Sequence, residues 1–301
     1  MTESTTTIDP KSIPATGNRL YQKFDLEEDR TRVSSHYEQD PEFFYILTGG
    51  GWHTYSCSFC ADTGDMTEAQ EKKLDLLAER MELKPGMYIL DVGCGWGGPL
   101  VYLCKKYNVR GLGIAVTAKQ IVEAQKRAAA YGVEAQFQVM HWKTLPEVET
   151  FDVVYSDETI VHFQDLGGFF AKCHQVLKSG HLMVHKELHL THSSYSELGR
   201  MSEYVNEIYS YTGNYIPLYR ELELLDQNGF QLKNITEIPM EHYRKTLDLW
   251  LKSMFDHRER MKSLEGVETY ERFRVYLKSM RYLFTHTGIF GLHVVTSRKI
   301  S

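Results

Sequence analysis

The stretch Ile89-Leu-Asp-Val-Gly-Cys-Gly-Trp-Gly-Gly98 decides the fold. Its first residues belong to a short apolar run that is typical of a buried strand in a parallel sheet. The glycines that follow permit positive φ angles and let the backbone pass close to a ligand. Open parallel sheets bind ligands at this place, outside the carboxyl end of a strand and at the start of a helix. The stretch therefore predicts a ligand-binding α/β fold.

Strand and helix patterns alternate along the chain. We predict strands over residues 87–92, 111–116, 135–140, 151–155, 181–190, 230–238 and 291–297. Helices are predicted over residues 99–107, from residue 117 onward, and over 168–177, 246–260 and 270–285. This alternation is typical of right-handed βαβ units. It predicts a Rossmann-like, doubly wound α/β sheet with parallel strands.

One segment interrupts the alternation. Residues 1–30 are predicted to form a flexible N-terminal leader and residues 31–301 a single domain. Within that domain, residues 191–220 are polar and carry six tyrosines: Tyr195, Tyr204, Tyr209, Tyr211, Tyr215 and Tyr219. We predict that this segment is a helical, tyrosine-rich lid, inserted after the fifth strand and ordered by substrate.

The composition excludes several classes of protein. A formal net charge of -6 gives no overall attraction to nucleic acid. No apolar run approaches the roughly 20 residues that cross a bilayer, and the first residues lack the order of a signal peptide. Five cysteines, an odd number, are consistent with a reducing compartment. We expect a cytoplasmic protein without stable membrane insertion, and a homo-oligomer is compatible with the sequence.

Asp91, directly before the glycines, narrows the choice of ligand. Its carboxylate can accept hydrogen bonds from a ligand and stabilise a nearby cation. A nicotinamide site would need an acidic residue at the end of the second strand, but that strand ends in Ile114-Ala-Val-Thr117. NAD is therefore disfavoured. Thr117 and Gln120 form a capping-box pattern at the carboxyl edge of the second strand.

The chain resembles the cyclopropane-fatty-acid synthase and mycolic-acid methyltransferase family of Class I S-adenosylmethionine-dependent methyltransferases. The resemblance runs from about His36 to Val295. Matching pieces include Thr54-Tyr-Ser-Cys57, Leu83-Lys-Pro-Gly86, Leu90-Asp-Val-Gly-Cys-Gly-Trp-Gly97, Gly113 to Gln120, His162-Phe163, Tyr243-Arg-Lys-Thr-Leu247 and Trp250. The resemblance implies that S-adenosylmethionine is surrounded by Tyr55, Ser56, Asp91, Gly93, Gly95, Gly97, Thr117, Gln120 and Trp142.

The same resemblance implies a catalytic site with one departure. The family holds a bicarbonate ion as base with a Cys, a Glu, a His and a Tyr, and Cys57, His185 and Tyr243 match three of these. Val161 stands where the family has the Glu, which argues against bicarbonate. Glu158 lies three residues earlier, so in a helical turn it would share a face with Val161.

Glu158 is our candidate for the catalytic base. A similar carboxylate serves as base in prenyl diphosphate C-methyltransferases, which this stretch also resembles. The alternative is a helix N-terminal acid that stabilises the helix dipole. His185, Glu187 and His189 alternate on one strand face, where two histidines and a carboxylate could bind iron. We favour His185 and Glu187 as residues that line the substrate pocket, with no metal.

The leading interpretation is C-methylation of an electron-rich carbon, an alkene or aromatic ring, in a small lipophilic metabolite. Such an acceptor could be a terpenoid, a prenyl diphosphate or an indole. One alternative is a cyclopropane synthase or methyltransferase that acts on fatty-acyl lipids. Others are an N-methyltransferase of a small amine and a non-catalytic, cofactor-binding subunit.

Overall fold

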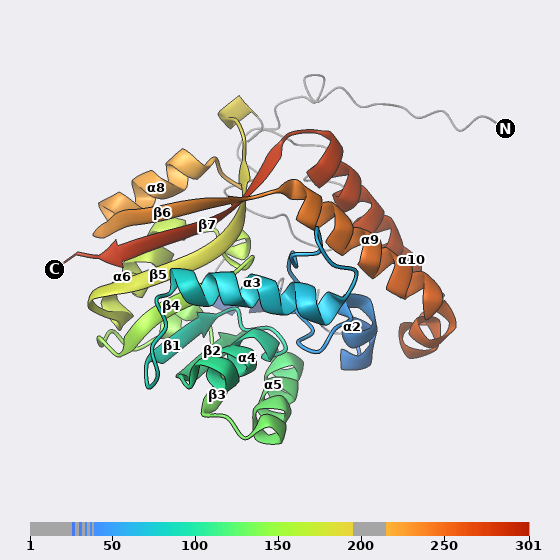
Figure 1. Cartoon of the computed structure of the whole chain (residues 1–301), viewed down its shortest axis with the longest axis horizontal. Helices are drawn as coiled ribbons and strands as arrows, with labels where there is room; N and C mark the ends of the chain where they lie inside the picture. The colour runs from blue at the N-terminus through green and yellow to red at the C-terminus, as the bar shows by residue number, and fades with distance from the viewer. Residues whose placement is uncertain are drawn as a thin grey trace.

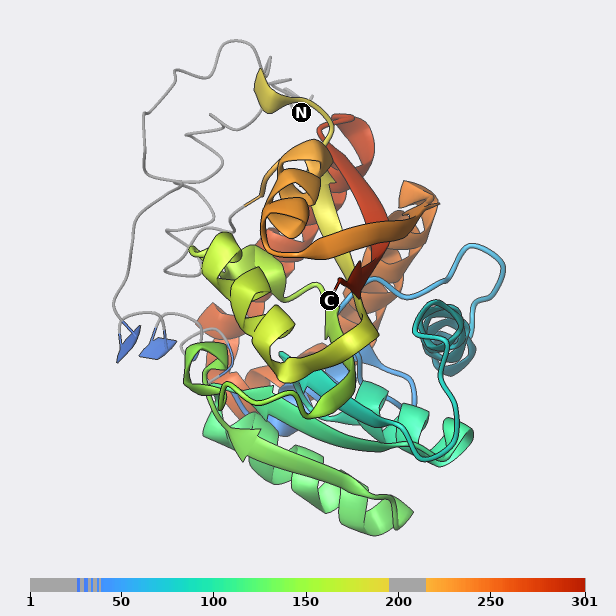
Figure 2. The same cartoon turned by 90° about the vertical axis from the view of Figure 1, so that its left-hand side faces the viewer.

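A twisted seven-stranded sheet with helices on both faces forms the body of the molecule (Figures 1 and 2). The computed structural model describes residues 26–27, 30–31, 34, 37, 39–194 and 215–300. The strands are β1 (Tyr88–Val92), β2 (Arg110–Ala115), β3 (Ala135–Val139), β4 (Phe151–Asp157), β5 (Leu177–Leu190), β6 (Phe230–Ile238) and β7 (Phe290–Lys299). Their order across the sheet is β3-β2-β1-β4-β5-β7-β6, so the predicted doubly wound α/β fold is confirmed.

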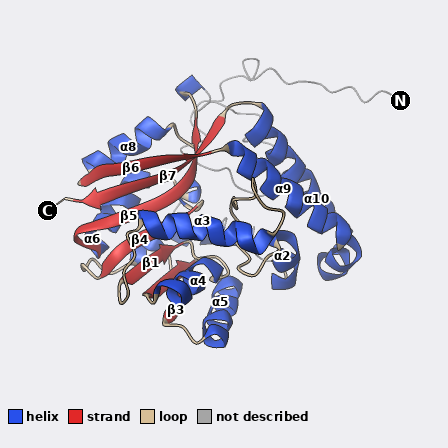
Figure 3. Cartoon of the chain, viewed as in Figure 1, coloured by secondary structure: helices blue, strands red, loops and turns tan. Residues whose placement is uncertain are grey.

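The helices form a layer on each face of the sheet and a group at one end of it. The helices are α2 (Pro41–Thr48), α3 (Met66–Arg80), α4 (Gly98–Tyr107), α5 (Ala118–Tyr131), α6 (Leu166–Val176), α8 (Leu218–Gln227), α9 (Met240–Asp256) and α10 (Arg258–His286), with short 3-10 turns η3 (Trp142–Thr144) and η4 (Ile160–His162). One buried core joins the sheet to α3, α4 and α5, and a second joins it to α6 and α8. Helices α2, α9 and α10 stand together at one end of the sheet (Figure 3).

The last strand departs from the prediction of a wholly parallel sheet. β1, β2, β3, β4 and β5 pair in parallel, whereas β7 is antiparallel to both β5 and β6. The chain leaves β6 at its carboxyl end, passes through the paired helices α9 and α10, and pairs Leu292 of β7 with Ile238 of β6. Because the two helices return the chain to the same end of the sheet, β7 must run in the direction opposite to β6.

The C-terminal helices also differ from their predicted bounds. α9 begins at Met240, and α10 runs for 29 residues from Arg258 with a kink at Gly266, where φ is 83°. The glycine conformation interrupts the helical backbone there, which is why the sequence pattern suggested two shorter segments. Together α9 and α10 place aromatic side chains near the carboxyl ends of β4 and β5.

The predicted leader and lid lie mostly outside the described residues. Of the lid, residues 195–214 are not described, so its mobility stays a prediction. Its last three residues, 218–220, begin α8, which packs on α6, and the lid itself stays a prediction. Within the described ranges, no helix has both the length and the apolar character needed to cross a membrane.

Candidate active site

The glycine loop after β1 adopts the predicted backbone conformations. Gly93, Gly95 and Gly97 have φ values of 83°, 50° and 77°. An added Cβ would lie 2.2 Å from Thr159 Cγ2 at Gly93 and 2.6 Å from Ala124 Cβ at Gly97. At Gly95 the nearest atom, Gln120 Nε2, would be 3.9 Å away. Gly97 therefore serves close packing of the loop on α5, while the backbone at Gly95 faces open space.

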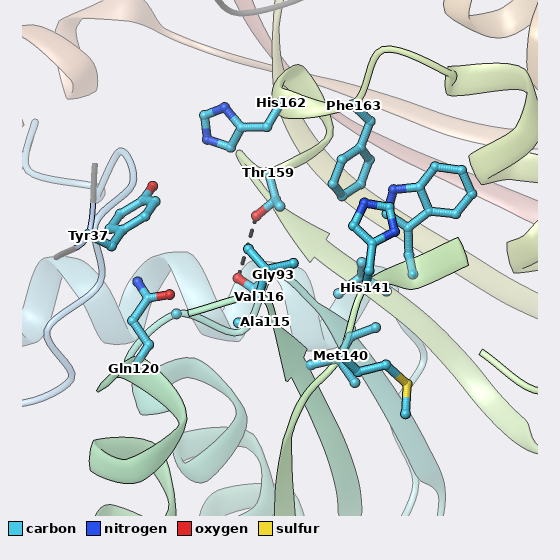
Figure 4. Close-up of a pocket in the computed structure, with 14 residues that line it drawn as sticks. Tyr37, Gly93, Ala115, Val116, Gln120, Met140, His141, Thr159, His162 and Phe163 are labelled. Atoms are coloured by element: carbon cyan, nitrogen blue, oxygen red, sulfur yellow. Dashed lines mark hydrogen bonds between the residues drawn. The ribbon is translucent and has the colours of Figure 1, made fainter. Parts of the chain in front are cut away.

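A cavity of about 610 Å³ lies beside this loop, between the ends of β1, β2 and β4 (Figure 4). Gly93, Gly95 and Gln120 line one side, and Trp142 and Phe163 line the other. The rings of Trp142 and Phe163 are 5.7 Å apart. In Figure 4 the Gln120 amide points into the space below Tyr37. A flat apolar ring would fit against the aromatic end, and a polar group would fit at the glutamine end.

A second cavity, of about 500 Å³, continues the first past Gln120 and the glycines toward Tyr55 and Ser56. Asp91 lines it and is buried, and its Oδ2 atom has no hydrogen-bond partner. Burial, and next the neighbouring Asp157, raise the pKa of the Asp91 carboxyl well above its ordinary value. This buried carboxylate is suited to a cationic or hydrogen-bond-donating ligand, because such a ligand would supply the missing partner.

The capping box predicted at the start of α5 lacks the hydrogen bond from its threonine. Thr117 is the N-cap residue, but its side chain caps no backbone N–H and its Oγ1 is buried without a partner. Gln120 lines both cavities. Seven of the nine predicted cofactor residues line one cavity or both; Gly97 and Thr117 do not.

A third cavity, of about 570 Å³, joins the second at Tyr37, Tyr55 and Glu158. Aromatic and aliphatic side chains from α9 and α10 form most of its wall, including Trp250 and Phe284. Tyr55 stacks on Trp250 with ring centroids 5.1 Å apart. The wall of the cavity is therefore largely aromatic, and the cavity shares lining residues with the second one.

Glu158 lies at the junction of the second and third cavities. Its Oε1 accepts a hydrogen bond from the Cys57 backbone N–H at 2.9 Å and pairs with Lys186, and its Oε2 accepts from the Tyr243 hydroxyl at 2.6 Å. The predicted helical turn is wrong, because Glu158 has a left-handed conformation with φ 54° and η4 begins only at Ile160. The conclusion drawn from it still holds, since Glu158 and Val161 line the same cavity.

Two buried lysines, which the sequence analysis missed, neutralise the carboxylates here. Lys186 Nζ lies 2.9 Å from Asp157 Oδ1, and Lys73 Nζ lies 2.8 Å from Asp157 Oδ2. Burial would raise the pKa of Asp157, but Lys186 and Lys73 outweigh it and hold that pKa low. Burial would lower the pKa of Lys186, but Asp157 and Glu158 raise it. The sequence marked Lys186 only weakly, because β5 carries other polar residues as well, among them His185 and Glu187.

Cys57 and Tyr243 both donate a hydrogen bond to Glu158, Cys57 from its backbone N–H and Tyr243 from its hydroxyl. Burial, more than any neighbour, raises the pKa of the Cys57 thiol and of the Tyr243 hydroxyl. Both groups therefore stay protonated at neutral pH. Cys57 contributes its backbone N–H rather than a thiolate.

His185 does not join this group. On β5, successive side chains point to opposite faces, so Lys186 faces Glu158 while His185 faces α8. There His185 Nε2 lies 2.7 Å from Glu221 Oε1, and His189 Nε2 lies 3.0 Å from Glu221 Oε2. The two histidines thus share a carboxylate on α8, and the described residues contain no group of side chains arranged for a metal ion. The family resemblance implied that His185 lies beside Cys57 and Tyr243, but the structure places it beside Glu221.

The order of the sheet, the glycine loop and the buried Asp91 near the end of β1 together define a Class I methyltransferase fold. The family model described as Mycolic acid cyclopropane synthetase matches residues 24–293. The chain belongs to this family, so the predicted class of enzyme, an S-adenosylmethionine-dependent methyltransferase, is confirmed.

Individual relatives agree with this membership. Cyclopropane mycolic acid synthase 1 from Mycobacterium tuberculosis is 29% identical, over 91% of this chain and 99% of that protein. A mycolic acid cyclopropane synthase solved with SAH and CTAB has a TM-score of 0.83 and 25% identity, over 90% of this chain and 98% of that one. Coclaurine N-methyltransferase, bound to N-methylheliamine and SAH, shares the fold with a TM-score of 0.79 and 19% identity, over 93% and 85% of the two chains.

The relatives bear on the choice of acceptor. Those with the higher identity are named for the cyclopropanation of mycolic acids, which are lipids. They therefore favour the alternative of an enzyme for acyl lipids over the leading interpretation of a small terpenoid, prenyl diphosphate or indole acceptor. The roles of the individual site residues stay predictions.

Proposed function

We propose that the chain transfers a methyl group from S-adenosylmethionine to a carbon–carbon double bond of a lipophilic acceptor, with Glu158 as the base. The names of the relatives favour an acyl chain as the acceptor. The observation that carries the proposal is the carboxylate of Glu158. It is held by Cys57 N–H, Lys186 and the Tyr243 hydroxyl at the junction of the second and third cavities.

The first two cavities fit the cofactor. Trp142 and Phe163 offer a flat apolar end for adenine, Gln120 offers an amide to the ribose, and Asp91 offers an unpartnered carboxylate to the amino group. S-adenosylmethionine, when bound, supplies an electrophilic methyl group on a sulfonium. Tyr55 lines both the second and the third cavity, so its ring lies between cofactor and acceptor.

The residues of the third cavity would then serve the acceptor. The π electrons of the alkene would form the new C–C bond as the S–CH3 bond breaks, and the electron pair of that bond would remain on sulfur in S-adenosylhomocysteine. A carbocation is then left on the neighbouring carbon of the acceptor. The aromatic faces of Tyr55, Tyr243 and Trp250 stabilise that positive charge. Glu158 accepts the proton whose loss restores neutrality. Loss from the new methyl group closes a cyclopropane, and loss from an adjacent carbon gives a methylated alkene.

C-methylation of a small metabolite is the second candidate function. The position of Glu158 favours it, because a base fixed in the chain, on the Cys57 N–H and Tyr243 donors, makes a separate bicarbonate ion unnecessary. Transfer to nitrogen is less well supported, since an amine that loses its own proton makes little use of so enclosed a base.

Product analysis separates the two candidates. The protein is incubated with S-adenosylmethionine and either an unsaturated phospholipid or a panel of prenyl diphosphates and indoles. Both reactions add one CH2, so NMR of the product is needed. Cyclopropane protons on the acyl chain would support the first candidate, and a new C–CH3 on a small acceptor would support the second. Transfer to nitrogen alone would contradict both.

We expect S-adenosylhomocysteine to raise the melting temperature, because a ligand that binds only the native state stabilises it. NADH should cause no shift, since no acidic residue ends β2. Replacing Gln120 by alanine should weaken S-adenosylhomocysteine binding by about tenfold, through the loss of hydrogen bonds. Val122→Ala, at an exposed position of the same helix, is the control. A saturating concentration of S-adenosylhomocysteine without any thermal shift would contradict the cofactor assignment.

A further inference from the structure

The acceptor cavity contains a second carboxyl group whose surroundings differ from those of Glu158. Glu187 is 3% exposed and lines the third cavity together with Glu158 and Val161. Its Oε2 accepts a hydrogen bond from the Val161 backbone N–H at 3.1 Å, and its Oε1 accepts one from the Leu188 N–H at 2.9 Å. Two backbone hydrogen bonds thus fix the carboxyl group at the cavity wall.

Glu187 differs from Asp157 and Glu158 because no cation balances it. Asp157 and Glu158 each pair with Lys186, whereas in the described part of the chain Glu187 forms no ion pair. Burial, followed by the neighbouring Glu158, raises the pKa of Glu187 well above its ordinary value. A cation or a strong hydrogen-bond donor that entered the cavity would relieve both effects.

The remaining wall of the cavity favours the same kind of ligand. Among its described lining residues none is Lys or Arg. Five are tyrosines, namely Tyr37, Tyr55, Tyr215, Tyr243 and Tyr276. Tyrosine rings attract cations to their faces. No Lys or Arg among the described lining residues could bind a phosphate or carboxylate. An anionic group in this cavity would lie beside two buried carboxyl groups and would be repelled.

The geometry points to an acceptor that brings an amino or hydroxyl group into this cavity, next to the carbon that is methylated. The N–H or O–H of that group donates a hydrogen bond to Glu187. This inference deepens the proposed function and rests on its assignment of the third cavity to the acceptor. Glu187 would then determine which acceptors bind, whereas Glu158 would act as the base. The phosphate or carboxylate of any acceptor would have to lie outside the cavity.

Three probes with one alkyl chain and different head groups test the inference. Decylamine, decanol and decanoate are titrated at pH 8 into protein saturated with S-adenosylhomocysteine, and Kd is measured by calorimetry. We expect decylamine to bind at least about tenfold more tightly than decanoate, with decanol between them, because opposite and like charges act in a buried site. Equal or tighter binding of decanoate, or no binding of any probe, would overturn the inference.

Glu187→Gln identifies the residue responsible. It should reduce the preference for decylamine over decanol by about tenfold, whereas Glu237→Gln, an exposed position on β6, should leave it unchanged. Glu187→Asp should keep most of the preference, and it replaces the glutamine variant if that protein does not fold. An unchanged preference in Glu187→Gln would contradict the inference. The thermal shift with S-adenosylhomocysteine alone tests the cofactor site separately, so the two proposals can fail independently.

Discussion

Glutamine in place of Glu158 lowers turnover by about 10²-fold or more and leaves the affinity for S-adenosylhomocysteine nearly unchanged. The amide keeps the shape of the side chain and can still accept hydrogen bonds from the Cys57 N–H and from Lys186. It cannot take up the proton that the acceptor must lose. Because S-adenosylhomocysteine has no sulfonium charge and Glu158 lies where the second cavity meets the third, its binding should not depend on the Glu158 charge. The measurement is single-turnover methyl transfer beside calorimetric binding of S-adenosylhomocysteine.

Glu82→Gln is the matched control. Glu82 is also a glutamate with a left-handed backbone, at φ 53°, but its side chain is 63% exposed. This variant should keep full activity. Removal and re-addition of bicarbonate should also leave activity unchanged, because the Glu158 carboxylate already occupies the Cys57 N–H and the Tyr243 hydroxyl. Strong dependence on bicarbonate, together with near-normal activity of Glu158→Gln, would instead indicate a bicarbonate base.

The features predicted best are those that short-range backbone geometry determines. Gly93 and Gly97 need positive φ and have no room for a Cβ, so the loop could be identified from its glycines alone. The apolar run before them fixes β1, and Asp91 follows from its place in that run. The contact between Glu158 and Tyr243 spans 85 residues, and only the family resemblance suggested it.

Features that depend on long-range packing could not be predicted in this way. Lys73 lies on α3 and pairs with Asp157, 84 residues away. A lysine on a helix is normally solvated, so no local pattern marks it as buried. His185 and Lys186 are neighbours on β5, and resemblance alone suggested the wrong one of the two for the face that meets Glu158. The direction of β7 likewise depends on how α9 packs on α10.

Methionine in place of Lys186 should reduce the free energy of unfolding by about 3–5 kcal/mol, because it removes a charge that balances two buried carboxylates. Urea denaturation at pH 8 measures this loss. Lys178→Met is the control on the same strand: its ion pair with Asp152 is 42% exposed on the lysine side, and such pairs contribute about 0–1 kcal/mol.

The pH dependence of the Lys186→Met variant gives a second, independent check. Without the ammonium group, burial should outweigh the remaining Lys73 and raise the folded-state pKa of Asp157 above its unfolded value. A carboxyl group of that kind destabilises the native state at high pH, and the cost falls as pH drops through its folded pKa. The deficit relative to the unaltered chain should therefore be smaller at pH 5 than at pH 8. Adding Glu158→Gln to Lys186→Met should recover part of the loss at pH 8. If the single variant loses less than about 1 kcal/mol at both pH values, Lys186 does not balance these carboxylates.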